Sequence, residues 1–77
     1  MTRSQFLFLI DEMIEAQPGT VREEHTLAEL EGWDSLAAVS FVAAVNERLG
    51  LTLSAKRLIE ASTVRDLLRL VQGKLED

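Results

Sequence analysis

Apolar side chains recur three or four residues apart in three separate stretches of the chain, and each stretch starts beside a residue that can cap a helix. This spacing gathers the apolar side chains on one face of an α-helix, whereas a half-buried strand would show alternation. One Pro and four Gly in 77 residues leave few positions that would interrupt such helices. The pattern predicts an all-α protein.

The first two helices can be placed by their ends. The first is expected over about residues 2–16; it opens with a capping box of Thr2 and Gln5 and is ended by the Pro and Gly that follow. The second is expected over about residues 34–49, with Gly50 as its C-terminal stop.

A short helix is expected over residues 54–61, and the last helix opens with a capping box of Thr63 and Asp66. Between the first two helices lies a long connection, residues 17–34, in which two Leu residues anchor a short capped turn. The expected architecture is one domain over residues 1–77, a small antiparallel helical bundle of three main helices plus one short helix.

Each helix is expected to turn one face to a thin core. In the second helix Leu36 is placed in the core, so that Ser35 points to solvent, and in the short helix Leu58 and Ile59 point inward. Replacing Leu36 or Leu67 with Ala should then cost about 2–4 kcal/mol. Three acids of the first helix are placed on a solvated outer face rather than in a metal site: Asp11, Glu12 and Glu15.

Composition and charge argue against several classes of function. The chain has no Cys, which removes disulfides, thiolate metal sites and a cysteine nucleophile. Its net charge is −5 with no basic stripe, which is unfavourable for binding nucleic acid. No apolar run approaches the roughly 20 residues that span a bilayer, and no signal-peptide cleavage site follows the N-terminal apolar run. A cytoplasmic protein is expected.

The stretch from Gly32 to Leu36 is the part best suited to carry chemistry. Asp34 is a favourable N-cap, and Ser35 falls in the first helical turn, beside free backbone amides that suit a phosphate ester. The same pair is also an ordinary helix cap. A hydrolase triad would need His25, the one His, but adjacent Asp34 and Ser35 cannot readily flank one imidazole. We therefore expect no enzyme.

With its surroundings, this stretch resembles the acyl carrier protein family, whose attachment motif is Asp-Ser-Leu at the start of the second helix. The resemblance covers nearly the whole chain: the motif Asp34, Ser35 and Leu36, the turn at 26–30, the helix end and loop at 49–53, and Thr63 with Val64. It implies that a phosphopantetheinyl transferase, with Mg²⁺, moves 4′-phosphopantetheine from coenzyme A to the Ser35 oxygen. The thiol of that arm would carry an acyl or an aminoacyl group as a thioester.

The resemblance also suggests where cargo and partners would meet the chain. An acyl chain would tuck between helices near four residues that are also plain core candidates: Leu27, Val45, Leu58 and Ala61. Partner enzymes of the acyl-activating, ketosynthase or acyltransferase type would dock on a face that is more apolar and less acidic than in carriers of fatty-acid synthesis. Its expected residues are Trp33, Ala37, Ser40, Glu47, Lys56 and Arg57. Trp33 either contacts the transferase or the arm, or packs over the loop.

The sequence therefore predicts a monomeric acyl carrier protein of a fatty-acid-like, polyketide or other specialised biosynthetic pathway. Two alternatives remain open: an aminoacyl or peptidyl carrier, and a small helical interaction module without a prosthetic group. Replacing Ser35 with Ala would leave the interaction module working and would abolish the carrier.

Overall fold

The computed structural model describes residues 1–76 and confirms the all-α fold. Within this range the chain forms four α-helices and two short 3₁₀ turns. These are α1 (Arg3–Met13), η1 (Leu27–Glu29), α2 (Ser35–Leu49), α3 (Ala55–Glu60), α4 (Val64–Val71) and η2 (Gln72–Lys74). The single domain expected over residues 1–77 includes Asp77, which lies outside the described residues.

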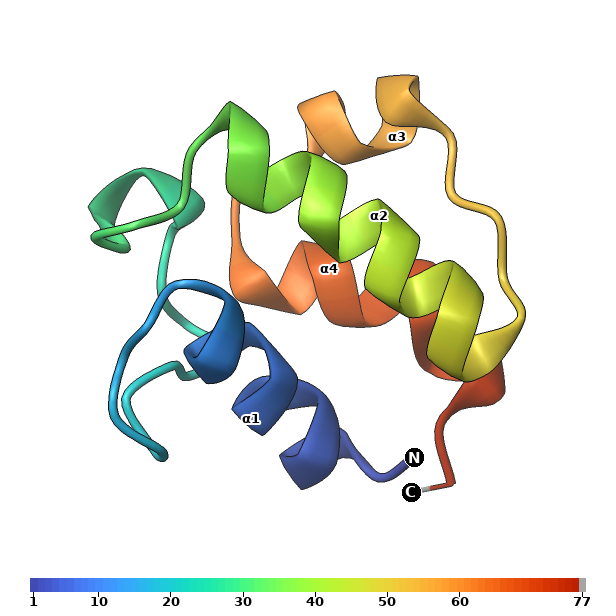
Figure 1. Ribbon diagram of the computed structural model, residues 1–77, viewed down its shortest axis with the longest axis horizontal. Coiled ribbons are helices and arrows are strands. Elements are labelled where there is room, and N and C mark those ends of the chain that lie inside the picture. The colour runs from blue at the N-terminus through green and yellow to red at the C-terminus, as the bar shows by residue number, and fades with distance from the viewer. Residues whose placement is uncertain (77) are drawn as a thin grey trace.

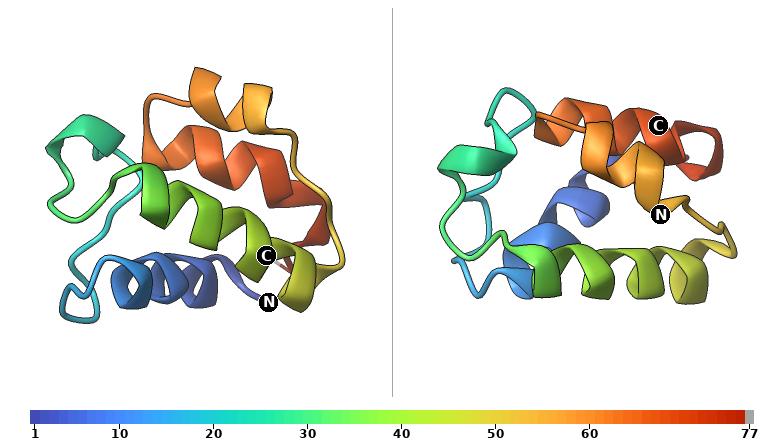
Figure 2. Two further views of the ribbon diagram at one scale, coloured as in Figure 1. Left: turned by 45° about the horizontal axis from the view of Figure 1, so that its top comes forward. Right: turned by 90° about the horizontal axis from the view of Figure 1, so that it is seen from above.

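The three longer helices pack together, and α3 borders α2 at one edge of the molecule (Figure 1). α1 runs opposite to α2, as expected for neighbouring helices of a small bundle. α2 and α4 run in the same direction, because the crossover that contains α3 carries the chain back to the end where α2 began (Figures 1 and 2). The start of α2 and the start of α4 therefore lie at the same end of the bundle.

The core is built from the inner faces of α1, α2 and α4. Phe6 of α1 and Phe41 of α2 are fully buried and meet edge to face, with ring centroids 5.7 Å apart and an interplanar angle of 83°. α4 turns an apolar stripe toward this core, and all four of its members are buried: Val64, Leu67, Leu68 and Val71.

α1 ends at Met13 rather than near residue 16. Glu15 adopts a left-handed backbone conformation with φ 59°, its N–H donates to the Glu12 carbonyl at 3.2 Å, and the Ala16 N–H donates to the Asp11 carbonyl at 2.8 Å. This pair of bonds is a Schellman motif, in which Glu15 occupies the position usually taken by Gly. The helix therefore stops before the Pro and Gly that the sequence suggested as its end.

The expectation that Asp11 shares a solvated face with Glu12 and Glu15 is wrong. The Asp11 side chain is buried, at 1% exposure, and its two carboxylate oxygens accept hydrogen bonds from the Gly19 and Val21 N–H groups, each at 2.9 Å. Glu12 and Glu15 are exposed. Asp11 thus fastens the first part of the long loop to α1.

The long loop is also fastened to the start of α4. Thr26 caps η1 and forms an antiparallel bridge with Thr63. The Leu27 N–H donates to the Ser62 carbonyl at 2.8 Å, and the Val64 N–H donates to the His25 carbonyl at 3.0 Å. These bonds hold Leu27 beside the connection between α3 and α4.

The three capping boxes seen in the structure, at Thr2, Thr26 and Thr63, agree with the sequence patterns. In the box of α4, the Asp66 carboxylate accepts from the Ser62 N–H at 2.9 Å and from the Thr63 N–H at 3.1 Å. These two backbone donors lower the pKa of Asp66 below its ordinary value of 3.8.

Candidate functional site

Ser35 is the first residue of α2, and its side chain is exposed. Asp34 caps the helix from an extended conformation, and its Oδ1 accepts from the Ala37 N–H at 2.9 Å. A cap of this kind satisfies one of the first-turn amides, while the others lack an acceptor within the helix. The Ser35 hydroxyl therefore sits in solvent at the positive end of a 15-residue helix, as the sequence predicted.

Gly32 determines how the loop enters this helix. Its φ is +94°, and a Cβ at this position would lie 2.8 Å from the carbonyl oxygen of Ile14. No other residue type would fit without a shift of the backbone, because backbone atoms cannot give way as a flexible side chain can. The Gly32 turn thus rests directly on the end of α1 and fixes the approach to Asp34 and Ser35.

The rotation of α2 differs from the expected one. Leu36 is 75% exposed and Val39 is 66% exposed, so neither belongs to the core. The buried positions are Ala37, Phe41 and Val45, which repeat every four residues along the helix. The large Phe41 ring occupies the core and turns Leu36 outward. Ser35 is exposed as predicted, but the prediction that a buried Leu36 fixes the rotation of the helix is wrong.

This rotation also corrects part of the expected docking face. Ala37 is buried and cannot contact a partner, and Trp33 is half-buried. Ile59 of α3, expected to point inward beside Leu58, is 82% exposed instead. The other four expected docking residues are exposed: Ser40, Glu47, Lys56 and Arg57.

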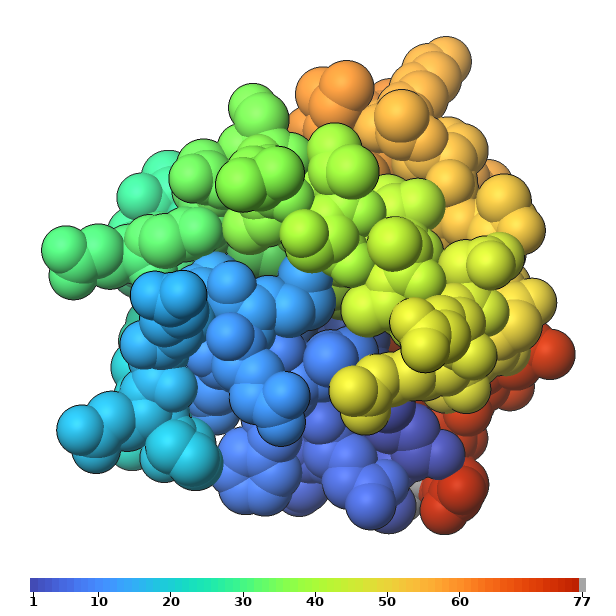
Figure 3. Space-filling view, viewed as in Figure 1, coloured from blue at the N-terminus to red at the C-terminus, as the bar shows by residue number. Residues whose placement is uncertain are grey.

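A groove of about 440 Å³ runs between α2 and α3, with Asp34 and Ser35 among the residues that line it. Of the four residues predicted to surround an acyl chain, Leu27, Leu58 and Ala61 line this groove, whereas Val45 is fully buried in the core and does not. In the space-filling view α2 crosses the visible face between α1 on one side and α3 on the other (Figure 3). Trp33, predicted as a docking residue, also lines the groove, and five further lining residues were not predicted as part of the site: Ala38, Val39, Val42, Ala55 and Ile59.

A helical repeat in the sequence could have identified the α2 wall of this groove. Ala38, Val39 and Val42 lie three, four and seven residues after Ser35, so they share its helix face. The α3 wall follows the same rule, because Ala55, Leu58 and Ile59 stand at positions i, i+3 and i+4 of that helix.

Trp33 forms part of the groove wall and also contacts the core. Its ring packs edge-on against Phe41, with centroids 5.9 Å apart and an interplanar angle of 68°. Phe41 in turn packs against Phe6. A chain of three rings thus links the residue before Asp34 to the centre of the bundle, and Trp33 combines packing with a place at the site.

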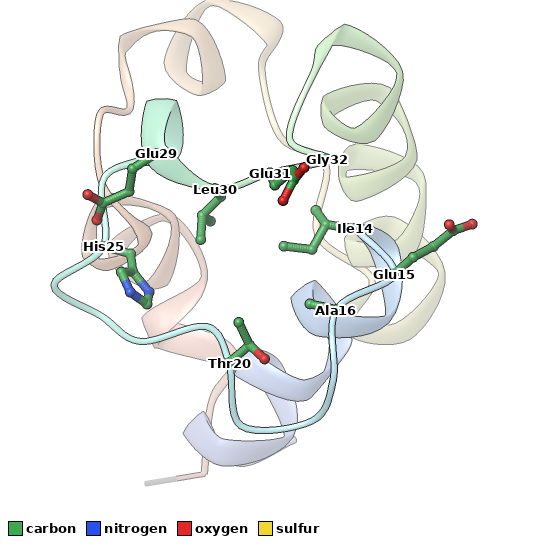
Figure 4. A pocket seen from close by; sticks show the side chains of 9 residues that line it. All are labelled: Ile14, Glu15, Ala16, Thr20, His25, Glu29, Leu30, Glu31 and Gly32. Atoms are coloured by element: carbon green, nitrogen blue, oxygen red, sulfur yellow. The ribbon is translucent and has the colours of Figure 1, made fainter.

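His25 lines a different hollow of about 600 Å³, between the long loop and the end of α1 (Figure 4). Its Nδ1 accepts from the Arg22 N–H at 3.0 Å, and the residues that line this hollow do not include Ser35. The Ser35, His25 and Asp34 side chains are therefore not assembled as a triad. Across residues 1–76, no three His, Cys, Asp or Glu side chains gather in a way that could hold a metal ion.

None of the helices in the described part of the chain combines the length and apolar character needed to cross a membrane.

A family model described as "Phosphopantetheine attachment site" matches residues 6–71, from the first buried residue of α1 to the last residue of α4. Comparison with curated proteins gives no significant match. The matched span contains the start of α2, the groove and the Trp33–Phe41–Phe6 ring contacts.

Proposed function

The chain belongs to the phosphopantetheine attachment-site family, and we propose that within this family it is an acyl carrier protein with Ser35 as the attachment residue. The family's cofactor is covalent 4′-phosphopantetheine. The observation that supports Ser35 is its position: an exposed hydroxyl on the first residue of α2, at an apolar groove. The residues around it fit a phosphate ester, because first-turn amides and the helix dipole favour an anion there.

The bound arm supplies a thiol, which carries acyl groups as thioesters and presents them to successive enzymes at high effective concentration. The chain's own residues hold and orient the attachment point. Asp34 fixes the helix start through the Ala37 N–H, and Gly32 holds the preceding turn against Ile14. Nothing in this role requires the chain to break or form bonds in the cargo, so we assign the chemistry to its partners.

The exposed apolar side chains around the site suit docking of several partners in turn. Leu36, Val39 and Ile59 flank Ser35 on α2 and α3. Residues 34–61 carry three acids, Asp34, Glu47 and Glu60, and three bases, Arg48, Lys56 and Arg57. A docking face with no net charge binds mainly through apolar contact, so its affinity for a transferase or an acyltransferase-type enzyme should depend weakly on salt.

The same exposed Leu36, Val39 and Ile59 favour one second candidate, an interaction module that acts without a prosthetic group. Such a module would bind its partner through these side chains and would have no use for the Ser35 hydroxyl. Modification of Ser35 therefore distinguishes the two functions.

The test is intact-mass spectrometry of the purified chain after incubation with coenzyme A, Mg²⁺ and a broad-specificity phosphopantetheinyl transferase. In the expected reaction the Ser35 oxygen bonds to the phosphorus of the phosphopantetheinyl group, 3′,5′-ADP leaves and the hydroxyl proton is released. The parent chain should gain one such group, and a thiol-reactive dye should then label a chain that has no Cys.

Ser35→Ala should gain nothing, whereas Ser4→Ala, which removes an exposed hydroxyl from α1, should be modified like the parent. Modification of Ser35→Ala would move the attachment to another residue. Absence of any mass gain on a folded parent chain, with several transferases, would favour the interaction module.

A further inference from the structure

Residues 30–33, just before the cap of α2, form a turn whose two ends are anchored in the bundle. The Trp33 N–H donates to the Leu30 carbonyl at 3.2 Å, and Gly32, with φ +94°, occupies the position at which a type II turn requires a positive φ. The side chain of Leu30 is buried, and the Trp33 ring packs against Phe41. The chain therefore enters α2 from a fixed direction.

Gly32 is the point at which this turn touches the end of α1 (Figure 4). A Cβ on Gly32 would lie 2.8 Å from the Ile14 carbonyl oxygen and 3.1 Å from the Ile14 Cβ, whereas ordinary contacts lie at 3.4–4 Å. A side chain at position 32 would therefore have to move away from Ile14 by about 0.6 Å, the difference between 3.4 and 2.8 Å. Glycine alone allows this close approach.

Such a displacement would fall on the attachment site rather than on α1. Ile14 is 9% exposed and its N–H makes a helical hydrogen bond of 3.1 Å, so the core and its own helix hold it in place. Gly32, Asp34 and Ser35 are exposed, and an exposed segment yields more readily than a packed core. Because Asp34 caps α2 through the Ala37 N–H, a shift of the turn would move or release this cap and displace Ser35 with it.

The position of Ser35 matters because its oxygen is a nucleophile that a partner must align. In the transferase reaction this oxygen forms a bond to a phosphorus of coenzyme A, the bond from that phosphorus to 3′,5′-ADP breaks, and the hydroxyl proton is released. Attack in line with the leaving group tolerates little displacement, and a misplacement of about 1 Å can cost about 100-fold in rate. A displacement of about 0.6 Å then corresponds to a loss of roughly tenfold.

We propose that Gly32 is a positioning residue for the modification of Ser35, and that the end of α1 is the support against which it sets the hydroxyl. The proposal rests on Ser35 as the attachment residue. Gly32 has no side chain that could take part in the reaction, and it acts through the Asp34 cap. The rate of modification then depends on Ile14, which lies outside the attachment motif.

The test measures single-turnover modification by intact mass, with transferase, Mg²⁺ and coenzyme A in excess over the full chain. Its dependence on transferase concentration gives a maximal rate, which reports the reacting geometry, and a half-saturating concentration, which reports docking. Gly32→Ala should lower the maximal rate about tenfold and change the half-saturating concentration by less than about threefold. Docking is maintained because the exposed side chains of Leu36, Val39 and Ile59 are unaltered.

Two matched variants separate the contact with Ile14 from the strain of a left-handed backbone. Gly19 and Gly50 also have positive φ, 89° and 67°, but a Cβ on either would meet nothing within 4 Å. Gly19→Ala and Gly50→Ala should therefore lose stability for the same conformational reason and yet keep the maximal rate of the parent. Each variant is assayed at a temperature at which circular dichroism shows it fully folded, so a general loss of stability does not lower the rate.

Hydrogen exchange of the Ala37 amide gives a second readout that needs no transferase. This N–H donates to Asp34, so Gly32→Ala should speed its exchange by about fivefold, as expected for loss of a helix cap, while Gly19→Ala should leave it unchanged. If Gly32→Ala does not fold, Gly32→Asn replaces it, because Asn adopts a positive φ more readily than Ala and brings the same Cβ toward Ile14. It should show the same slow modification.

A parent-like maximal rate in folded Gly32→Ala, or equal slowing in Gly19→Ala and Gly50→Ala, would overturn the proposal while leaving Ser35 as the attachment residue. A rise in the half-saturating concentration alone would overturn it too, because Gly32 would then act in docking. Unchanged Ala37 exchange in Gly32→Ala would exclude the positioning role without reference to any transferase. Failure of the parent chain to gain mass would instead overturn attachment at Ser35.

Discussion

Removal of the Asp11 carboxylate should destabilise the protein more than any other single change to an acidic side chain described above. Its two oxygens each accept a backbone N–H at 2.9 Å, one from Gly19 and one from Val21, whose side chain is buried. Hydrogen bonds to charged groups contribute about 1.5–3 kcal/mol each. The better helix propensity of Ala offsets about 0.5 kcal/mol. Asp11→Ala should therefore lower the free energy of unfolding by about 2.5–5.5 kcal/mol.

A loss of this size is a large share of the total, because 77 residues at typical values give about 4–12 kcal/mol. Urea denaturation, followed by Trp33 fluorescence and by circular dichroism, measures it. Asp11→Asn keeps one acceptor oxygen and should lose about half as much, which keeps the comparison measurable if Asp11→Ala unfolds. Glu12→Ala, the neighbouring exposed acid, should stay within about 0.5 kcal/mol of the parent. If Asp11→Ala also stayed within about 1 kcal/mol, the assignment of these two bonds as the anchor of the loop would be refuted.

Three further predictions follow from the backbone and from burial. Leu67→Ala should cost about 2–5 kcal/mol in chemical denaturation, whereas Leu36→Ala, at 75% exposure, should cost less than about 1 kcal/mol; similar losses would contradict the observed rotation of α2. Glu15→Gly should raise the melting temperature, because Gly adopts φ 59° without strain; an unchanged or lower value would show that the Glu15 side chain compensates. The lowered pKa of Asp66 stabilises the fold above its ordinary value of 3.8, and this contribution is lost as pH falls through the lower folded pKa. Asp66→Asn should therefore flatten the acid limb of a stability–pH curve; an identical limb would exclude this role.

Local signals in the sequence were sufficient for the helix starts. A capping box is formed within four consecutive residues, so Thr2, Thr26 and Thr63 could be recognised without knowledge of the fold. The same holds for the left-handed Gly50 at the end of α2 and for Asp34 as the cap of the site helix. The position of Ser35 at the first turn depended on these local signals and was therefore predictable.

The rotation of α2 could not be read from its sequence, because apolar residues occupy nearly its whole circumference. Leu36, Val39 and Val42 make one apolar stripe, and Ala37, Phe41 and Val45 make another. Which stripe is buried depends on residues outside α2. Phe6 of α1 and Trp33 of the preceding loop both pack against the Phe41 ring. Only tertiary packing decides between two such stripes.

Asp11 was misplaced for a related reason. Helical periodicity assigns a carboxylate to the solvated face by default, and it carries no information about a loop that folds back to supply two N–H donors. The Gly19 and Val21 amides lie eight and ten residues further along the chain, beyond the reach of any helical pattern. The Schellman turn at Glu15 was missed as well, because Glu seldom takes the left-handed conformation.

Four consecutive residues before and at the site each connect it to a different part of the fold. Gly32 rests on the Ile14 carbonyl at the end of α1, Trp33 is braced by Phe41, Asp34 caps α2, and Ser35 alone is left free in solvent. Core packing and site geometry are therefore held by the same short segment. A change that loosens the end of α1 should also shift the start of α2, because the Gly32 turn packs against Ile14. Such a change should consequently displace the groove and the Ser35 hydroxyl together, because Asp34 and Ser35 are part of the groove lining.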